Sequence, residues 1–295
     1  MRAANVNALF KSSTIFCNSP ADQFDMLIVD EAHRLNEKSG LFSKGENQVK
    51  EIIHASKVAV FFIDEAQRLD IKDIGSKEEI VKWADFFVCE TDDSVKLTAQ
   101  FRCNGSDEYL KWVDQLLEVR NTRQIYLFKE SFDLRIYDTP NEMFREIKLK
   151  NKSNNKSRCV AGYCWEWKSK VKSDDMDIVF PEYRFRAQWN HENDSAWSIS
   201  KGSVSQIGCI HTCQGLEFDY VGEIIGNDII YRNGHILVDP SKRSPDDFNI
   251  RGYKAMMKNN PEETKELLRK IIKNTYRTLM TRGMNGCSFT SWMMN

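Results

Sequence analysis

Met26-Leu-Ile-Val-Asp-Glu-Ala-His33 and Val58-Ala-Val-Phe-Phe-Ile-Asp-Glu-Ala-Gln67 are the two stretches that decide the fold. Each opens with a short apolar run that lacks a helical period, and the run leads into an Asp-Glu pair. Such runs are typical of fully buried parallel strands, and here the carboxyl end of each strand carries the acids. Residues 46–56 lie between them and place apolar side chains at helical spacing. Strand, helix and strand in this order predict a right-handed βαβ unit.

Length and composition narrow the class of protein. At 295 residues we expect one large or two medium α/β units. The 42 Lys and Arg residues balance 43 Asp and Glu residues, which excludes a polycationic tail that binds nucleic acid, so any such contact needs a local groove. No apolar run approaches the ~20 residues of a membrane helix. The eight cysteines lack the two-residue spacing of zinc or redox sites, so we expect a reduced, soluble, cytoplasmic protein.

Caps and apolar runs extend the α/β pattern along the chain. Helices are predicted over 76–84, from Ser106, from Thr139 and from Asn260 to Met280. Strands are predicted at 95–99, 134–137, 158–163, 178–180, 205–210, 220–225 and 287–290. The composition becomes more polar after Arg120, so we expect a domain boundary near residues 120–132.

Asp30 and Glu31 stand at the carboxyl end of a predicted parallel strand, which is where open α/β sheets bind ligands. In P-loop NTPases the first acid of such a pair holds Mg²⁺. The second can activate the attacking water as a general base. Acids also end strands simply because they are solvated there. The apolar run before Asp30 and the Ala-His-Arg sequence after Glu31 favour the catalytic interpretation.

Gln67 comes three residues after the second predicted strand. At that distance its amide can reach a γ-phosphate or an attacking water. A plain surface turn explains the same residue equally well.

Five segments, in chain order, resemble motifs II to VI of superfamily 1 helicases. They are Asp30-Glu-Ala-His33 (motif II, the Walker B element), Asp64-Glu-Ala-Gln67 (III), Leu97-Thr-Ala-Gln-Phe-Arg102 (IV), Ile210-His-Thr-Cys-Gln-Gly-Leu-Glu-Phe-Asp219 (V) and Tyr276-Arg-Thr-Leu-Met-Thr-Arg-Gly283 (VI). With Cys159-Val-Ala-Gly-Tyr-Cys-Trp165, they look closest to an uncharacterised schlafen-type DNA/RNA helicase family, known as a domain of unknown function. The resemblance covers residues 26–290, and the five ordered motifs together are specific.

This resemblance implies an α/β fold of two RecA-like parallel-sheet domains. The first, residues 1–125, would be truncated at its N-terminus and carry motifs II to IV. The second, residues 126–295, would carry motifs V and VI and an irregular insertion near 165–204. The implied cofactors are ATP and Mg²⁺, and the implied partner is DNA or RNA.

The resemblance also implies catalytic roles. Asp30 would coordinate Mg²⁺ and Glu31 would activate water, while Gln67 would sense the γ-phosphate. Arg102 and Arg282 would be arginine fingers, a role worth ~10³–10⁵ in rate where it has been measured. For Arg282 a simpler alternative remains, because arginines at helix ends also interact with the negative end of the helix dipole.

The remaining implied contacts are to the nucleotide and the nucleic acid. Asp64, Gly215 and Glu217 would bind the nucleotide, with Glu217 at its ribose. His211 and Gln214 would link the nucleotide site to nucleic acid.

Trp165 and Trp189 stand among Lys168, Lys170, Lys172, Arg184 and Arg186. Aromatic rings interleaved with cations can form a groove on which bases stack. Core tryptophans beside a solvated basic face are an equally good explanation.

A phosphate-binding loop of the form G-x-x-x-x-G-K-[ST] does not occur in the sequence. Gly40 and Gly45 have its glycine spacing, but Glu46 stands where the lysine belongs. In the resembled family the loop precedes the motif II strand, so we expect an N-terminal segment or a fused domain to carry Walker A. We also expect weak or no ATP binding by this chain alone, and an exposed apolar sheet edge in the first domain.

Two classes of function therefore stay open. The chain is the C-terminal part of an ATP-dependent nucleic-acid helicase or translocase, or it is a non-catalytic nucleic-acid-binding or regulatory module derived from one. A zinc site or a Cys/His hydrolase built from Cys209, His211 and Cys213, alternating on one strand, fits the spacing poorly.

Overall fold

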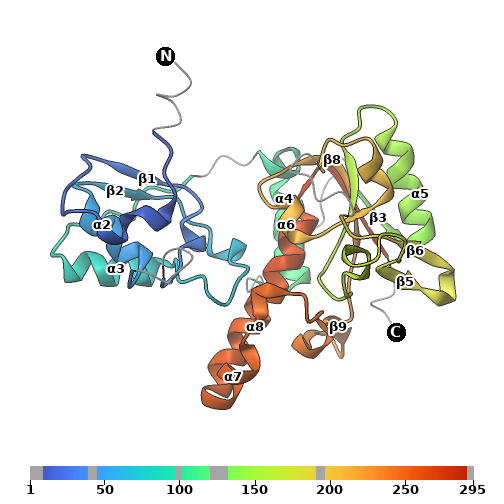
Figure 1. Ribbon diagram of the computed structural model, residues 1–295. Coiled ribbons are helices and arrows are strands. Elements are labelled where there is room, and N and C mark those ends of the chain that lie inside the picture. The colour runs from blue at the N-terminus through green and yellow to red at the C-terminus, as the bar shows by residue number, and fades with distance from the viewer. Residues whose placement is uncertain (1–8, 39–44, 98–100, 120–131, 191–196, 291–295) are drawn as a thin grey trace. The chain divides into compact units, whose positions relative to one another are not determined.

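The computed structural model describes residues 9–38, 45–97, 101–119, 132–190 and 197–290 (Figure 1). The chain divides into two compact units, Met1–Leu97 and Thr98–Asn295, called unit 1 and unit 2 below. The domain boundary predicted between residues 125 and 126 lies outside the described residues. Of the described helices, none has both the length and the apolar character needed to cross a bilayer.

Unit 1 is built on the predicted βαβ arrangement. Its elements are β1 (Leu27–Val29), α2 (Gln48–Ala55), β2 (Ala59–Phe61) and α3 (Lys77–Phe86), with 3₁₀ turns η1 (Ser13–Asn18), η2 (Ala32–Arg34) and η3 (Glu65–Gln67). β1 and β2 are parallel, with Ile28 paired to Val60. Asn47 caps α2 and Ser76 caps α3 through side-chain oxygens that accept backbone N–H groups, so local capping chemistry sets both helix starts.

Only one face of this strand pair is buried. The described core joins β1 and β2 to α2 through Leu27, Val29, Ala59 and Phe61 on the strands and Val49, Ile52 and Ala55 on the helix. On the opposite face Ile28 is 67% exposed. The prediction of fully buried strands is therefore wrong for this face, because no second layer covers it among the described residues. Apolar exposure was expected at a sheet edge, and here it extends across a face.

The strand predicted over 95–99 is not formed at residues 95–97, and residues 98–100 lie outside the described part.

Unit 2 contains a five-stranded, all-parallel sheet. Its order is β3 (Asp133–Tyr137), β11 (Gly283–Thr290), β8 (Phe218–Ile224), β4 (Ser157–Ala161) and β7 (Ile207–Gly208). Its described helices are α4 (Asp107–Leu116), α5 (Pro140–Asn151), α6 (Ile210–Cys213), α7 (Tyr253–Asn259) and α8 (Pro261–Met280). Two antiparallel hairpins, β5 (Ile178–Phe180) with β6 (Phe185–Ala187) and β9 (Ile229–Arg232) with β10 (His235–Val238), complete the unit. The predicted α/β class with a parallel sheet is confirmed.

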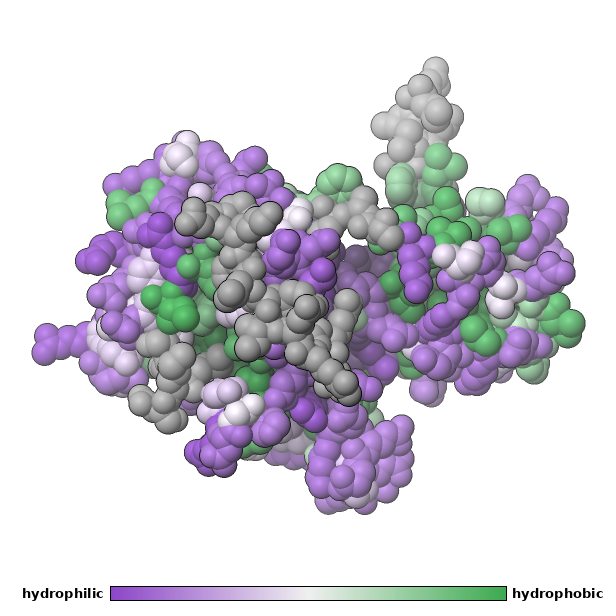
Figure 2. Space-filling model, turned by 180° about the vertical axis from the view of Figure 1, so that it is seen from behind, coloured by the Kyte–Doolittle hydropathy of each residue, from purple (hydrophilic) through white to green (hydrophobic). Residues whose placement is uncertain are grey.

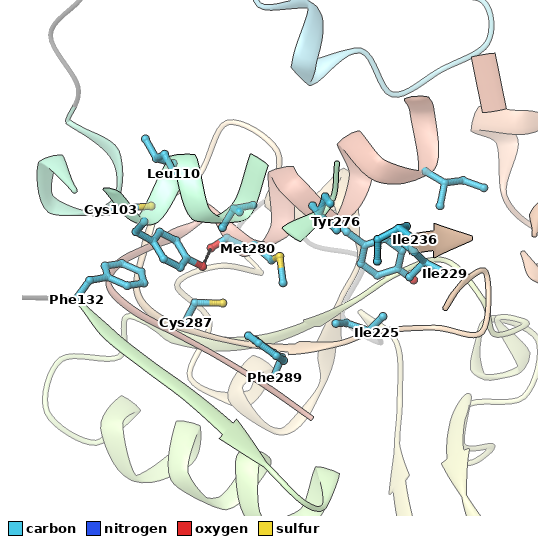
Figure 3. Close-up of a cluster of buried hydrophobic side chains, with 14 residues drawn as sticks. Cys103, Leu110, Phe132, Ile225, Ile229, Ile236, Tyr276, Met280, Cys287 and Phe289 are labelled. Carbon is cyan, nitrogen blue, oxygen red and sulfur yellow. Dashed lines mark hydrogen bonds between the residues drawn. The ribbon is translucent and has the colours of Figure 1, made fainter. Parts of the chain in front are cut away.

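Helices pack on the sheet of unit 2 in two separate cores. In the first, shown in Figure 3, Cys287 and Phe289 of β11 pack with α4 and α8. In the second, Met143 and Ile147 of α5 pack with β4. A Cβ on Gly222 of β8 would lie 2.7 Å from the Ile147 side chain, so glycine is what lets α5 approach the sheet this closely.

Two predicted features of unit 2 differ from the structure. The strand predicted over 205–210 is confined to β7, and Ile210–Cys213 forms α6 instead. The Thr212 hydroxyl accepts the Cys209 N–H at 3.1 Å, which starts a helical turn, so the cysteines and His211 do not alternate on a strand. Within the insertion near 165–204, residues 191–196 lie outside the described part, and the β5–β6 hairpin is regular.

Candidate functional site

The acids of unit 1 lie where parallel strands end. Asp30 directly follows β1 and is exposed, and its Oδ1 accepts the Glu31 N–H at 2.9 Å. Glu31 has a φ of 52°, a left-handed conformation that a non-glycine residue adopts only rarely. Asp64 follows β2 and caps η3 by accepting the Ala66 N–H at 3.2 Å. The structure therefore brings the predicted motif II and III acids to the same end of the strand pair, the carboxyl ends of β1 and β2.

His33 connects these two motifs. Its ring is 1% exposed, and Nδ1 accepts the Asp64 backbone N–H at 3.4 Å. Because Nδ1 accepts, a neutral ring carries its proton on Nε2, and Nε2 lies 3.2 Å from Glu31 Oε2. His33 therefore lies between the Glu31 carboxylate and the Asp64 backbone, with one ring nitrogen near each.

Gln67 is 5% exposed and is directed at Asp64. Its Nε2 donates to Asp64 Oδ2 at 2.8 Å. The predicted γ-phosphate sensor and the predicted nucleotide-binding acid thus form one hydrogen-bonded pair.

The chemistry of this end of the strand pair fits Mg²⁺ bound together with phosphate. An exposed carboxylate such as that of Asp30 is a ligand that Mg²⁺ prefers, and Mg²⁺ in nucleotide sites commonly takes one or two carboxylates plus phosphate oxygens and water. Within the described ranges no three His, Cys, Asp or Glu residues gather as a metal-binding group. The residues therefore fit a metal held partly by a nucleotide and do not fit a cage made of protein alone.

Charged residues of motifs IV, V and VI act electrostatically on one thiol in unit 2. Burial raises the pKa of Cys103 to about 12; the positive charges of Arg102 and Arg282 oppose this rise, and the negative charge of Glu217 adds to it. The Cys103 Sγ also lies 3.7 Å from the Thr281 carbonyl, 178 residues along the chain. Three segments that are distant in sequence are therefore neighbours around Cys103.

Arg282 is almost fully buried and binds main-chain carbonyls. Its Nε donates to Thr278 O at 3.0 Å and its Nη1 to Leu216 O at 3.2 Å. The Phe218 N–H donates in return to Arg282 O at 2.8 Å. The predicted alternative, in which this arginine binds carbonyls at a helix end, is thus present in the structure, and the same side chain ties motif V to motif VI.

Arg102 begins a tight turn, η4 (Arg102–Gly105). Cys103 and Asn104 have φ values of 52° and 54°. Two successive non-glycine residues in the left-handed region are costly and persist only where surrounding contacts hold them. The buried thiol of Cys103 supplies such contacts, and Arg102 beside it is half-buried.

Of the other predicted residues of motif V, His211 lies in α6, and Gln214, Gly215 and Glu217 follow this helix. His211, Gly215 and Glu217 are exposed, and Gln214 is half-buried. Gly215 has a φ of +79°, a conformation that favours glycine and turns the chain between α6 and β8.

Comparisons with known proteins identify the family of the chain. Residues 2–292 match the family model described as Schlafen group 3, DNA/RNA helicase domain. The chain belongs to this family. An uncharacterised protein of Saccharomyces cerevisiae is 28% identical over an alignment of 287 residues, and this alignment covers 89% of this chain and 61% of the yeast protein. The Schlafen group 3 match includes all five motif segments.

The tryptophans predicted to stack on bases lie differently in this Schlafen group 3 chain. Trp189 is 1% exposed, its Nε1 donates to the Trp165 carbonyl at 3.3 Å, and its ring stacks on Tyr163. Trp165 is half-buried and packs on the same core. This geometry favours the core alternative for Trp189, because its ring faces protein on both sides.

Sequence reasoning missed several of the groups that hold these residues. His33 was identified only as part of its motif, although its neighbours Glu31 and Asp64 were both predicted. Cys103 carried no signal beyond its position after Arg102. The carbonyl acceptors of Arg282 cannot be recognised in a sequence, because every residue has a main-chain carbonyl.

Proposed function

We propose that this chain forms part of an NTP-dependent nucleic-acid helicase or translocase built from RecA-like domains. The observation that carries this proposal is that motifs IV, V and VI adjoin: the Cys103 thiol lies 3.7 Å from the Thr281 carbonyl, and Arg282 donates to the Leu216 carbonyl at 3.2 Å. Arg102 and Arg282 belong to segments that are far apart in the sequence, and phosphoryl transfer requires guanidinium groups placed together. Membership of the Schlafen group 3 DNA/RNA helicase domain family supports DNA or RNA as the partner.

In unit 1 the reaction uses the carboxylates at the carboxyl ends of β1 and β2. Asp30 would hold Mg²⁺, which would neutralise charge on the phosphates of a bound nucleotide. Glu31 accepts a proton from the attacking water as a general base. His33 orients Glu31, and Asp64 with Gln67 forms the part that responds to the γ-phosphate.

In unit 2 the reaction uses planar cations. Arg102 and Arg282 stabilise the charge that develops on the transferring phosphoryl group, for which the fork of a guanidinium is better suited than an ammonium. Glu217 contacts the ribose and Gly215 gives the backbone room beside it. His211 and Gln214 link the nucleotide site to the nucleic acid.

ATP binding by this chain alone is weak, because its sequence has no G-x-x-x-x-G-K-[ST] loop to hold the β- and γ-phosphates. A phosphate-binding loop carried by another segment or domain would complete the site. The second candidate function, a non-catalytic nucleic-acid-binding or regulatory module, is favoured by the position of Arg282, whose guanidinium is already bound to two carbonyls.

Oligonucleotide binding tests the proposal. Fluorescence anisotropy with labelled single-stranded DNA and RNA, measured over a range of salt concentrations, should show binding that weakens as salt rises. His211→Ala should weaken it, whereas His235→Ala, a change at the exposed histidine of the β9–β10 hairpin, should not. Millimolar Mg·ADP should change the affinity for a motor and leave it unchanged for the non-catalytic module. Absence of salt-dependent binding would reject both.

A further inference from the structure

Residues 248–260 of unit 2 carry positive charge that the fold does not balance. They include Arg251, Lys254 and Lys258, and they contain no Asp or Glu. Among the residues that the structure describes, none of these three cations forms an ion pair, although the helix that follows is rich in such pairs. Each lysine and arginine of α8 has a carboxylate partner: Lys265 pairs with Glu262, Arg269 and Lys273 with Glu118, Lys270 with Glu266, and Arg277 with Asp114.

The helix α7 in this segment lacks the features that usually stabilise a short helix. It has no buried residue, and no side chain caps its N-terminus. Tyr253 and Met257 are half-buried, whereas Lys254 and Lys258 are exposed. The two lysines stand about one turn apart, so their like charges repel within a helix that is too short to be stable alone. The basic side of α7 therefore costs stability in the free chain, and a polyanion bound there would relieve the repulsion.

The basic side of α7 is accessible and continues onto an aromatic ring. Figure 1 shows α7 and the first turns of α8 projecting beyond the sheet of unit 2, and Figure 2 shows from behind that this projection has a largely hydrophilic surface. The Cζ of Arg251 lies 3.9 Å from the centroid of the Phe248 ring, which is 51% exposed. Exposed cations and an exposed ring thus occur together, and we name Phe248, Arg251, Lys254 and Lys258 the basic patch.

We propose that the basic patch binds single-stranded nucleic acid, an inference that rests on the proposed function and adds a contact surface to it. The three cations contact phosphates, and the Phe248 ring stacks on a base. Single-strand binders without sequence preference combine positive charge along the backbone with rings on which bases stack, because every base has a flat face. An acidic protein segment is the other polyanion that the charge admits, and the exposed ring favours the nucleic acid.

The experiment measures binding of the full chain to labelled oligo(dT) and oligo(rU) by fluorescence anisotropy over a range of salt concentrations. Lys254→Gln and Lys258→Gln should each reduce the slope of log K against log salt by about 0.7 in magnitude, because each removes one phosphate contact. Phe248→Leu should weaken binding by about five-fold or more without changing the slope, since it removes stacking and no charge. Lys265→Gln is the matched control and should change neither quantity, because the Lys265 ammonium is already paired with Glu262 at 2.7 Å.

Three results would overturn the proposal. The first is an equal slope in Lys254→Gln, Lys258→Gln and Lys265→Gln. The second is equal affinity for duplex and single strand together with no effect of Phe248→Leu. The third is full displacement of the oligonucleotide by poly-L-glutamate at equal charge concentration, because the patch would then serve an acidic protein.

The design separates failure of the basic patch from failure of the proposed function. If His211→Ala weakens the complex and the variants of the basic patch do not, the basic patch is rejected and the proposed function stands. If the wild type shows no salt-dependent binding, both are rejected. Circular dichroism checks that the variants, all at exposed positions, remain folded.

Discussion

The imidazole of His33 accepts the backbone N–H of Asp64 at 3.4 Å, across a separation of 31 residues. The His33 ring is almost fully buried, and its Nε2 lies 3.2 Å from the Glu31 carboxylate. This ring thus touches both acid motifs of unit 1.

His33→Ala should destabilise unit 1 by about 1–3 kcal/mol, since it removes a buried ring and leaves a part-buried amide without its acceptor. His33→Asn should recover part of this loss, because its amide oxygen can accept the same N–H. The measurement is hydrogen exchange at the amides of β1 and β2. Arg34→Ala, at an exposed position of the same 3₁₀ turn, is the control. Equal exchange rates in His33→Ala and Arg34→Ala would contradict the bridging role.

Asp114 and Arg277 form a buried ion pair that joins α4 to α8. Removing one partner of such a pair leaves an uncompensated charge and costs about 3–5 kcal/mol, whereas replacing both by apolar residues can be neutral. Arg277→Met and Asp114→Leu should therefore each lower the free energy of unfolding in urea by about that amount. The double variant should be markedly more stable than either single one. Additive losses in the double variant would show that the two residues act independently.

Local chemistry made much of this fold predictable. Ser106 and Thr139 were predicted as helix starts, and each accepts the N–H three residues further on. The βαβ unit followed from two apolar runs with a helical segment between them. These features depend on residues close in sequence, which is where propensity and capping act.

The features that were not predictable depend on distant contacts. The run around Ile28 is apolar on both sides, so the sequence cannot tell that only one face is covered. Ile210–Cys213 has the apolar pattern of a strand, yet the hydrogen bond between Thr212 and Cys209 turns it into a helix. The positions of the motif residues near Cys103 depend on packing between segments that are distant in the sequence.

Glu223 is a fully buried carboxyl group in the central strand β8, and neither of its oxygens has a hydrogen-bond partner in the described part of the chain. Burial, helped by the negative charge of Asp228, raises the pKa of Glu223 well above its usual value of 4.5. The folded state therefore holds a proton that the unfolded state releases, and stability falls as pH rises from about 4.5 towards the raised pKa.

Glu223→Met should remove this pH dependence and make the protein more stable than the wild type at pH 8. The difference between the two proteins should grow by up to about 1.4 kcal/mol per pH unit between the two pKa values. Urea unfolding at a series of pH values measures it, with the exposed Glu217→Gln as control. Parallel curves of stability against pH for the wild type and Glu223→Met would show that this carboxyl group does not cause the pH dependence.

The pKa of Glu118 is lowered, whereas that of Glu223 is raised, because Glu118 accepts hydrogen bonds from cations. Its carboxylate accepts from Lys273 at 2.9 Å and Arg269 at 3.0 Å, and the Ile236 N–H donates to it at 3.2 Å. Burial raises the pKa of Glu118, but the hydrogen bond and charge of Lys273 and the Ile236 N–H outweigh it and lower the pKa to about 2. These contacts join the end of α4 to α8 and to the β9–β10 hairpin.

Glu118→Gln should therefore lower the free energy of unfolding at pH 7, where the wild-type carboxylate is charged. A carboxyl group with a depressed pKa stabilises the folded state above its unfolded pKa and loses that contribution as pH falls through the folded value. The wild type and Glu118→Gln should thus converge as the pH approaches 2, measured by chemical unfolding from pH 7 downward. Glu266→Gln removes an exposed pair with Lys270 at 4.0 Å and should have little effect throughout. A constant gap between wild type and Glu118→Gln at every pH would mean that shape, and not charge, is what Glu118 contributes at the junction of α4, α8 and the hairpin.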